Sequence, residues 1–293
     1  MVEASAKVPV SILVPIKNEA DNLPRSLGSV SWADEIIVVD SQSTDGSQQV
    51  AESWGARVVQ FQFNGTWPKK KQWSLDNIEF RNDWIFILDA DEVLPPEAEE
   101  EFRNLLKTTP YTIDGYWINR RFMFMGKWLK HAYYPNWNLR LVRRGQARFE
   151  KLTKSATASG DNEVHEHILV EGRTGNLTVE MDHYAFPDVD TFVEKHNRYS
   201  NWEAVVATEA GTEKDVLQKS TVSRRRGLKR LASKMPCRPL LRFLYVYLWQ
   251  RGFLDGKEGY YFARLHGYYE FLIVAKTVEL KKRKTSTSAS SKH

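Results

Sequence analysis

The 293-residue sequence contains little cysteine and no long uninterrupted apolar run, and both absences exclude classes of protein. Its one cysteine, Cys237, cannot form an intrachain disulfide, which fits a reducing cytoplasm. No basic segment followed by an apolar one opens the chain, so we expect no secretory signal. The most apolar C-terminal segments, 240–249 and 260–278, are short or interrupted by charges, whereas a spanning helix needs about 20 mostly apolar residues. We therefore expect a cytoplasmic protein.

The first hundred residues alternate between strand patterns and short helical patterns. Strands are predicted at 10–16, 35–39, 57–61 and 84–88, and helices at 23–30 and 47–54. This alternation is typical of βαβ units and a parallel sheet, so we predict an α/β fold. No G-x-G-x-x-G follows the first strand, which argues against a dinucleotide-binding Rossmann domain.

A cluster of acids follows the fourth predicted strand. The apolar run Trp84–Leu88 leads directly into Asp89, Asp91 and Glu92. Ligands bind beyond the carboxyl ends of such strands, and alternation along an extended chain would put Asp89 and Asp91 on one side. Two carboxylates there suit a hard divalent cation that also holds a substrate's phosphates. The alternative is an acidic loop that caps the helix expected from Pro95.

Two further acids belong to the second predicted strand and its turn. Asp40 ends the strand, where it can offer a carboxylate to the polar edge of a base or ribose. Asp45 lies in the turn Ser43–Gly46, and it either contacts the same ligand or caps the helix that follows.

Several segments, taken in order, resemble a family 2, GT-A-fold glycosyltransferase, particularly the bacterial lipopolysaccharide-core glucosyltransferases. The matching segments are 14–19, 33–41, 43–46, 71–75, 88–92, 139–145 and 164–166. The resemblance covers roughly residues 8–200. It implies a nucleotide-diphospho-sugar transferase fold, with a Rossmann-like mixed sheet and helices on both faces. It also implies metal-dependent, inverting transfer from a nucleotide-diphosphate sugar, with a UDP-sugar favoured.

The resemblance assigns roles to individual residues. Asp40 would contact the nucleotide base, Asp89 would lie near the ribose, and Asp91 would hold Mn²⁺ or Mg²⁺ on the diphosphate. His183 would complete the metal shell of Asp91, or be a structural histidine. Lys71 aligns with a basic position near the pyrophosphate, or is a solvated lysine. The other expected nucleotide-sugar contacts are Pro15, Lys17, Glu19, Ser41, Asp45 and Ala90.

The middle of the chain is expected to form the acceptor side. Period-two patterns predict strands at 116–122 and 138–143, with an aromatic-rich loop between them. Aromatic rings there suit stacking against sugars, and they equally suit an ordinary core. Trp137, Arg140 and His165 are the expected acceptor contacts.

Glu166 is the candidate catalytic base, because it occupies the position that resembles the family's base-bearing segment. Inverting transfer needs a base to take the proton of the acceptor hydroxyl. Many relatives carry an Asp preceded by an acid here, whereas His165 precedes Glu166 in this chain. The alternative is a glutamate paired with a nearby arginine.

A zinc hydrolase is a formal alternative. His165 and His167 would share one face of a strand, with Asp182 and His183 downstream as further ligands. The helical H-E-x-x-H pattern is missing, however, and zinc hydrolysis leaves the acids at 89 and 91 unexplained.

Basic and aromatic residues concentrate in the C-terminal third. The chain has 42 basic and 37 acidic side chains, and basic clusters lie at 224–230 and 281–284. Helices after residue 188 with aromatic residues and basic flanks fit the interface of an anionic leaflet. The alternative is packing on the catalytic domain or at a dimer contact, and the oligomeric state stays open. Since no recognition module accompanies the basic patches, we expect no nucleic-acid partner.

These patterns predict the organisation of the chain. A GT-A catalytic domain spans 1–187, with a nucleotide-binding half at about 8–108 and an acceptor half at about 109–187. A helical, membrane-interfacial region follows at 188–284, and a disordered tail at 285–293.

The predicted reaction moves a sugar to a hydroxyl of a glycolipid or lipid-linked saccharide in cell-envelope polysaccharide synthesis, at the inner face of the membrane. One alternative is a polyprenyl-phosphate sugar synthase, in which a lipid phosphate attacks and no strong base is required. The other is a catalytically silent sugar-nucleotide binder.

Overall fold

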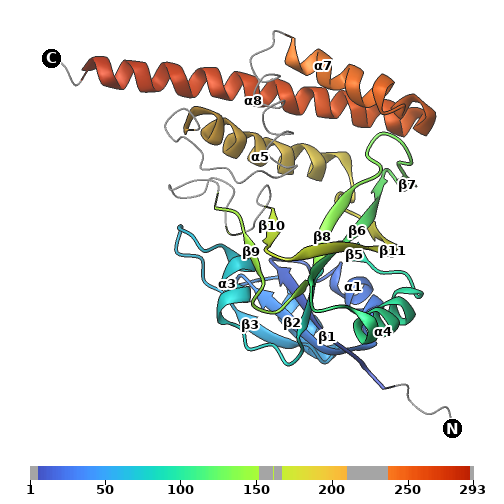
Figure 1. The fold of residues 1–293 in the computed structure, drawn as a ribbon. Helices are drawn as coiled ribbons and strands as arrows, with labels where there is room; N and C mark the ends of the chain where they lie inside the picture. The colour runs from blue at the N-terminus through green and yellow to red at the C-terminus, as the bar shows by residue number, and fades with distance from the viewer. Residues whose placement is uncertain (1–5, 152–160, 162–166, 210–236, 291–293) are drawn as a thin grey trace. The chain divides into compact units, whose positions relative to one another are not determined.

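The computed structural model describes residues 6–151, 161, 167–209 and 237–290 (Figure 1). The chain divides into two compact units, which are described separately. In its described parts, the first unit runs to Trp128 and resumes from Tyr134 to Ala185. The second unit contains the segment Leu129–Tyr133 and the chain from Phe186 onward.

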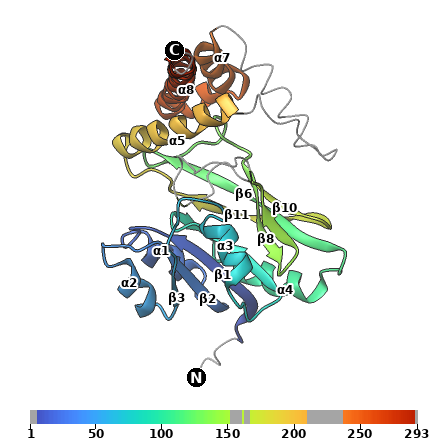
Figure 2. The ribbon, with the colours of Figure 1, turned by 90° about the vertical axis from the view of Figure 1, so that its left-hand side faces the viewer.

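A mixed sheet forms the centre of the first unit. Its first four strands pair in parallel in the order β3 (Arg57–Gln60), β2 (Ala33–Asp40), β1 (Val8–Ile16) and β4 (Trp84–Ile87). Of these, β3, β2 and β1 are labelled in Figure 2. The sheet continues with β8 (Trp137–Arg143), β6 (Ile113–Phe124), β11 (Arg173–His183) and β5 (Glu92–Val93). A short β7 (Lys127–Trp128) pairs with β6, while β9 (Ala147–Phe149) and β10 (Ile168–Val170) pair with each other.

Helices cover both faces of this sheet. They are α1 (Leu23–Ser29), α2 (Ser47–Ser53), α3 (Lys70–Asn77) and α4 (Ala98–Thr108). Successive residues of a strand point to opposite faces, so Ile12 packs in one apolar cluster with Leu23 and Phe102, and Leu13 packs in another with Ile37. Trp73 of α3 packs against the second cluster. The strands are apolar on both faces because both faces are buried, and the α/β fold predicted from the sequence is confirmed.

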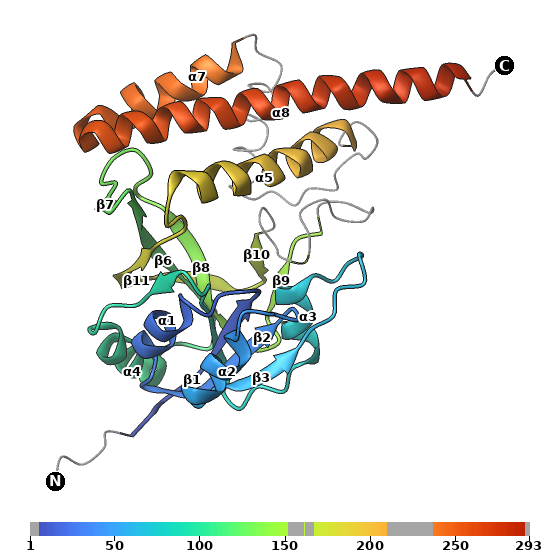
Figure 3. The same cartoon turned by 180° about the vertical axis from the view of Figure 1, so that it is seen from behind.

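The second unit is helical. It contains α5 (Val189–Glu209), α7 (Arg238–Leu244), the π-helical turn η1 (Tyr245–Trp249), the 3₁₀ turn η2 (Gly252–Asp255) and α8 (Gly256–Ser290). Both α5 and α7 pack along α8 (Figures 1 and 3). The helix α8 continues to Ser290, so the disordered tail predicted from residue 285 begins inside a helix. Polar Ser/Thr composition alone predicted disorder there, and it missed the continuation of a long helix.

The α7–α8 hairpin depends on glycine at two close approaches. A Cβ atom on Gly267 would lie 3.1 Å from the carbonyl oxygen of Pro239, and one on Gly259 would lie 2.0 Å from that of Gly252. Only a residue without a side chain allows the helices to approach so closely.

The segment between β7 and β8 is held in the helical unit by one carboxylate. Asp255 is 2% exposed and accepts hydrogen bonds from the backbone N–H groups of Lys130 (3.0 Å), His131 (3.0 Å) and Ala132 (2.8 Å). The Nδ1 atom of His131 lies 2.9 Å from the same carboxylate. This segment was predicted to belong to the acceptor half, because its bonding partner Asp255 lies more than a hundred residues away in the chain.

Within the ranges that the structure describes, no helix combines the length and the apolar character needed to cross a bilayer.

Candidate active site

The C-terminal ends of three parallel strands meet at one edge of the sheet. Ile16 of β1 pairs with Asp40 of β2, and Leu13 pairs with Ile87 of β4. Asp89 follows β4 after one intervening residue. Because parallel strands end at the same edge, Asp40 and Asp89 lie on the side where such sheets bind ligands, as the sequence predicted.

Asp89 is held between two cations. Its Oδ1 atom lies 2.7 Å from Lys71 Nζ, and its Oδ2 atom lies 2.6 Å from Arg140 Nη2. Burial raises the pKa of Asp89, but Arg140 and Lys71 together hold it well below its usual range. The side chain of Lys71 is only 9% exposed, so the reading of a solvated lysine is wrong.

Glu92, for which the sequence predicted no role, fixes the turn that contains Asp89 and Asp91. It is fully buried, and its Oε1 atom lies 2.6 Å from Arg140 Nη2 and 3.1 Å from Arg120 Nη1. Its Oε2 atom accepts a hydrogen bond of 2.9 Å from the backbone N–H of Asp89. The turn residues Asp89–Asp91 are not part of β4 or β5, so their geometry comes from this bonding and not from strand alternation. A third acid directly after the aspartates was the signal available in the sequence.

Asp91 and His183 are brought together by the pairing of β5 with β11. Glu92 and His183 are register partners, and the N–H of Tyr184 donates to the Asp91 carbonyl oxygen at 2.8 Å. His183 Nε2 lies 3.6 Å from Asp91 Oδ1, too far for a good hydrogen bond. The Nδ1 atom of His183 is buried and has no hydrogen-bond partner among the residues that the structure describes.

This pair fits a divalent cation as one carboxylate and one imidazole ligand. Among the described residues, no group of three or more His, Cys, Asp or Glu side chains could hold a metal ion. Any further ligands of a cation would then come from water or from the phosphates of a bound substrate.

The Asp40 carboxylate is hydrogen-bonded by its own turn and by the neighbouring strand β3. It is 1% exposed, and it accepts hydrogen bonds from the N–H of Ser43 (3.1 Å) and from Gln60 Nε2 (3.0 Å). The neighbouring Ser41 is also buried, and its N–H donates to the carbonyl oxygen of Ile16 at 3.1 Å. The strand end is therefore a rigid part of the site.

Asp45 joins two loops at this edge. One of its oxygens accepts from the N–H of Ser47 (3.0 Å) at the start of α2, and the other accepts from the N–H of Ala20 (3.0 Å). Burial raises the pKa of Asp45, but the bonds from Ser47 and Ala20 lower it overall. The N–H of Glu19 donates to Ser47 Oγ at 2.8 Å, which adds a second tie between the loops. Asp45 thus bonds the first N–H of α2, but the N-cap residue of that helix is Gly46.

Other expected contacts differ in their exposure. Lys17 is exposed at the same edge, while Pro15 and Ala90 are buried. Trp137 is 43% exposed at the start of β8. Arg140 is buried and engaged by Asp89 and Glu92, and its expected contact with an acceptor stays a prediction. His165 and Glu166 lie outside the described residues.

A buried lysine beside the site escaped the sequence analysis. Lys70 is fully buried, and its Nζ atom donates to the Ile16 carbonyl oxygen at 2.6 Å and lies 3.2 Å from Asp161 Oδ2. Burial lowers the pKa of Lys70, although Asp161 raises it in part. Burial also raises the pKa of Asp161, but the Lys70 ammonium outweighs it and leaves that pKa lowered. Three consecutive lysines at 69–71, in a segment that is not exposed, were the available signal.

Comparison with known proteins decides the family. Residues 11–162, about half of the chain, match glycosyl transferase family 2. The chain belongs to this family. Family membership and the mixed sheet together confirm the predicted GT-A fold.

Two relatives of this family 2 chain are similar over most of its length. The lipopolysaccharide core biosynthesis glycosyltransferase LpsC of Rhizobium meliloti is 31% identical over 216 residues, which cover 70% of this chain and 74% of LpsC. An uncharacterized glycosyltransferase of Rickettsia bellii is 28% identical over 275 residues, covering 92% of this chain and 86% of the relative.

Solved structures show more distant similarity. Glucosyl-3-phosphoglycerate synthase from Mycobacterium tuberculosis, in complex with Mn²⁺, UDP and glucosyl-3-phosphoglycerate, is 25% identical with a TM-score of 0.31. That match covers 39% of this chain and 44% of the synthase. The mannosyltransferase PcManGT from Pyrobaculum calidifontis, in complex with GDP-Man and Mn²⁺, is 15% identical with a TM-score of 0.48. That match covers 94% of this chain and 88% of the mannosyltransferase.

Proposed function

We propose that this family 2 chain is an inverting glycosyltransferase. It moves a sugar from a nucleotide-diphosphate donor, with a UDP-sugar favoured, to a hydroxyl of a glycolipid or lipid-linked saccharide. The observation that carries the proposal is the gathering of Asp40, Asp89 and Asp91 at one sheet edge in a family 2 chain, with Lys71 beside them. Similarity to LpsC, which is named for lipopolysaccharide core biosynthesis, supports an acceptor of the cell envelope.

The donor would lie across the strand ends. Asp40 would face the nucleotide base, Asp89 the ribose, and Lys71 the pyrophosphate. Asp45 would act indirectly, because its hydrogen bonds hold the loops at 18–20 and 43–47 against each other.

Asp91 and His183 would hold Mn²⁺ or Mg²⁺, which when bound neutralises the charge that develops on the leaving diphosphate. The 3.6 Å separation between Asp91 Oδ1 and His183 Nε2 supports this pairing, because it places a carboxylate oxygen and an imidazole nitrogen side by side without a good hydrogen bond between them. The chain's own part is to aim both side chains at one point through the β5–β11 pairing.

Glu166 would act as the general base. It would take the proton of the acceptor hydroxyl as that oxygen bonds to the anomeric carbon and the bond from that carbon to the diphosphate oxygen breaks. The acceptor hydroxyl belongs to a lipid-linked molecule, so we place the enzyme at the cytoplasmic face of an anionic membrane. In this proposal residues 1–187 carry catalysis and 188–284 contact the membrane.

Calorimetric titration of UDP and GDP into the purified protein, with and without Mn²⁺, tests the donor site. We expect Mn²⁺-dependent binding of UDP, lost in Asp91→Ala and kept in Asp182→Asn. Asp182 is the matched control, because it precedes His183 in β11 but pairs with Arg121 at 2.7 Å. Failure of folded wild-type protein to bind either nucleotide would contradict the proposed donor.

A further inference from the structure

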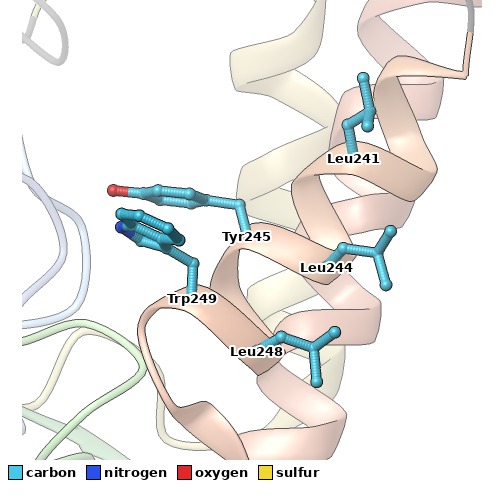
Figure 4. A pocket seen from close by; sticks show the side chains of 5 residues that line it. All are labelled: Leu241, Leu244, Tyr245, Leu248 and Trp249. Atoms are coloured by element: carbon cyan, nitrogen blue, oxygen red, sulfur yellow. The ribbon is translucent and has the colours of Figure 1, made fainter.

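The hairpin formed by α7, η1 and η2 has an exposed apolar face. Leu241, Leu244, Tyr245, Leu248 and Trp249 are between 36% and 80% exposed, and they line a shallow pocket together. Their spacing of three to four residues repeats along the helical turns, and Figure 4 shows the three leucines in a row beside the two aromatic rings. Five large apolar side chains therefore remain in contact with water.

This face is not the one that packs against α8. Val246 is fully buried, and Phe243 and Tyr247 pack their rings against Tyr260 of α8, with centroid distances of 6.1 and 5.7 Å. The side of α7 and η1 that packs within the unit is therefore a different one. The leucines of the exposed face are 36% to 55% exposed, and among the described residues of the unit they have no comparable packing role, which marks them as a contact surface.

The turn of the hairpin is apolar as well. Trp249 is 80% exposed, and Phe253 and Leu254 of η2 are 47% and 54% exposed. The next residue, Asp255, is buried and bonded to three consecutive backbone N–H groups, so the turn that presents these side chains is firmly held. Surface turns are ordinarily polar, and a held turn with three exposed apolar side chains is suited to insertion.

Positive charge surrounds the apolar face. Residues 238–264 contain five Arg or Lys residues and two acids; Arg238 is paired with Glu270 at 2.6 Å, and one of the two acids is the buried Asp255. Arg242 lies 5.8 Å from the ring of Tyr245, and Arg264 lies 5.7 Å from the ring of Phe243. Leucine, tryptophan and tyrosine flanked by arginine match the composition of segments that lie in the headgroup region of an anionic leaflet.

We propose that this hairpin face inserts into the headgroup region of an anionic bilayer, with Trp249 and η2 at its deepest point. The inference rests on the proposed function, because a lipid-linked acceptor must be reached at a membrane. It identifies the surface within the helical region that inserts, which is the exposed face of α7, η1 and η2.

Sedimentation with phosphatidylcholine vesicles, with and without phosphatidylglycerol, tests this contact on the full chain. We expect wild-type protein to bind the anionic vesicles, and added salt to weaken the binding because screening reduces the attraction. The double variant Leu248→Ser/Trp249→Ser should bind about 100-fold more weakly, since burying one such side chain is worth about tenfold or more. Tyr111→Ser is the matched control, because Tyr111 is 93% exposed in the first unit, and its binding should equal that of wild type.

Three results would overturn the inference. They are no binding of wild type to anionic vesicles, equal binding by the double variant, and a wild-type dimer that the double variant dissociates while vesicle binding is unchanged. UDP calorimetry on the same proteins separates this inference from the proposed function. Vesicle binding without nucleotide binding would support the membrane contact and contradict the proposed donor. Nucleotide binding without vesicle binding would support the donor and contradict the membrane contact.

Discussion

Arg140 Nη2 lies 2.6 Å from Asp89 Oδ2 and 2.6 Å from Glu92 Oε1, so one guanidinium joins both ends of the turn that carries Asp91. Arg140 is 6% exposed and Glu92 is fully buried. Both acids would repel each other at this separation without the cation between them. The position of Asp91 therefore depends on a side chain from β8, some fifty residues later in the chain.

Arg140→Met should destabilise the fold by about 3 kcal/mol, because it removes the cation between Asp89 and the buried Glu92 and leaves only Lys71 and Arg120 to offset their charges. Arg148→Met is the matched control. Arg148 pairs with Glu171 at 3.2 Å on the surface, and loss of such a pair costs at most about 1 kcal/mol. Urea unfolding of both variants measures the difference. Equal losses would show that the buried network adds nothing to stability.

His183→Phe should raise the Mn²⁺ concentration needed for half-maximal UDP binding at least about tenfold. The substitution keeps a ring against Phe122, whose centroid lies 5.4 Å from that of His183, and it removes only the nitrogen atoms. Calorimetry at a series of Mn²⁺ concentrations measures the shift, with unfolding midpoints to show that the fold is intact. An unchanged Mn²⁺ requirement would make His183 a structural residue.

Local patterns predicted the strands and the acidic residues at their ends, and they could not predict which cations meet those acids. The run Trp84–Leu88 is apolar because both faces of β4 are buried, so its reading needed no tertiary information. Arg140, in contrast, was read as an acceptor contact, since nothing near it in the sequence shows that β8 lies beside β4. The same limit applies to Lys70 and Asp161, and to Asp255 and the segment at 130–132. Buried ion pairs join residues that lie far apart in the chain. The local sequence pattern around each residue therefore does not reveal its partner.

Asp45→Ala should lower the free energy of unfolding by about 1 kcal/mol, through loss of the hydrogen bonds to Ser47 and Ala20. The extra stability that saturating UDP confers should be nearly unchanged, because the side chain acts within the protein. Thermal unfolding with and without UDP and Mn²⁺ separates the two effects, and the exposed Asp21→Ala serves as control. A large loss of UDP stabilisation would instead assign Asp45 a direct contact with the donor.

The Lys70–Asp161 pair should give the fold an acid-sensitive contribution to stability. The pKa of Asp161 is lowered in the folded state, so its contribution is present above the unfolded value of about 3.9 and is lost as pH falls through the folded value. The double variant Lys70→Met/Asp161→Asn should therefore lose less stability than wild type between about pH 5 and the acid limit of folding. Urea midpoints across this range test the sign. Parallel pH profiles would mean that the pair does not contribute.

Glu166→Gln should reduce transfer to a hydroxyl acceptor by about 10²–10⁴-fold while leaving UDP affinity unchanged, because the amide cannot accept the proton. A polyprenyl-phosphate acceptor is already ionised and needs no base, so the same variant should largely keep its activity on that substrate. Transfer of labelled sugar from UDP-sugars to an envelope lipid extract, and separately to polyprenyl phosphate, compares the two acceptors. Glu171→Gln is the control, since Glu171 is 76% exposed in the same part of the chain. If Glu166→Gln still transfers sugar to a hydroxyl acceptor, another residue is the base. If the wild-type protein binds UDP-sugar but turns over neither acceptor, the catalytically silent binder is favoured.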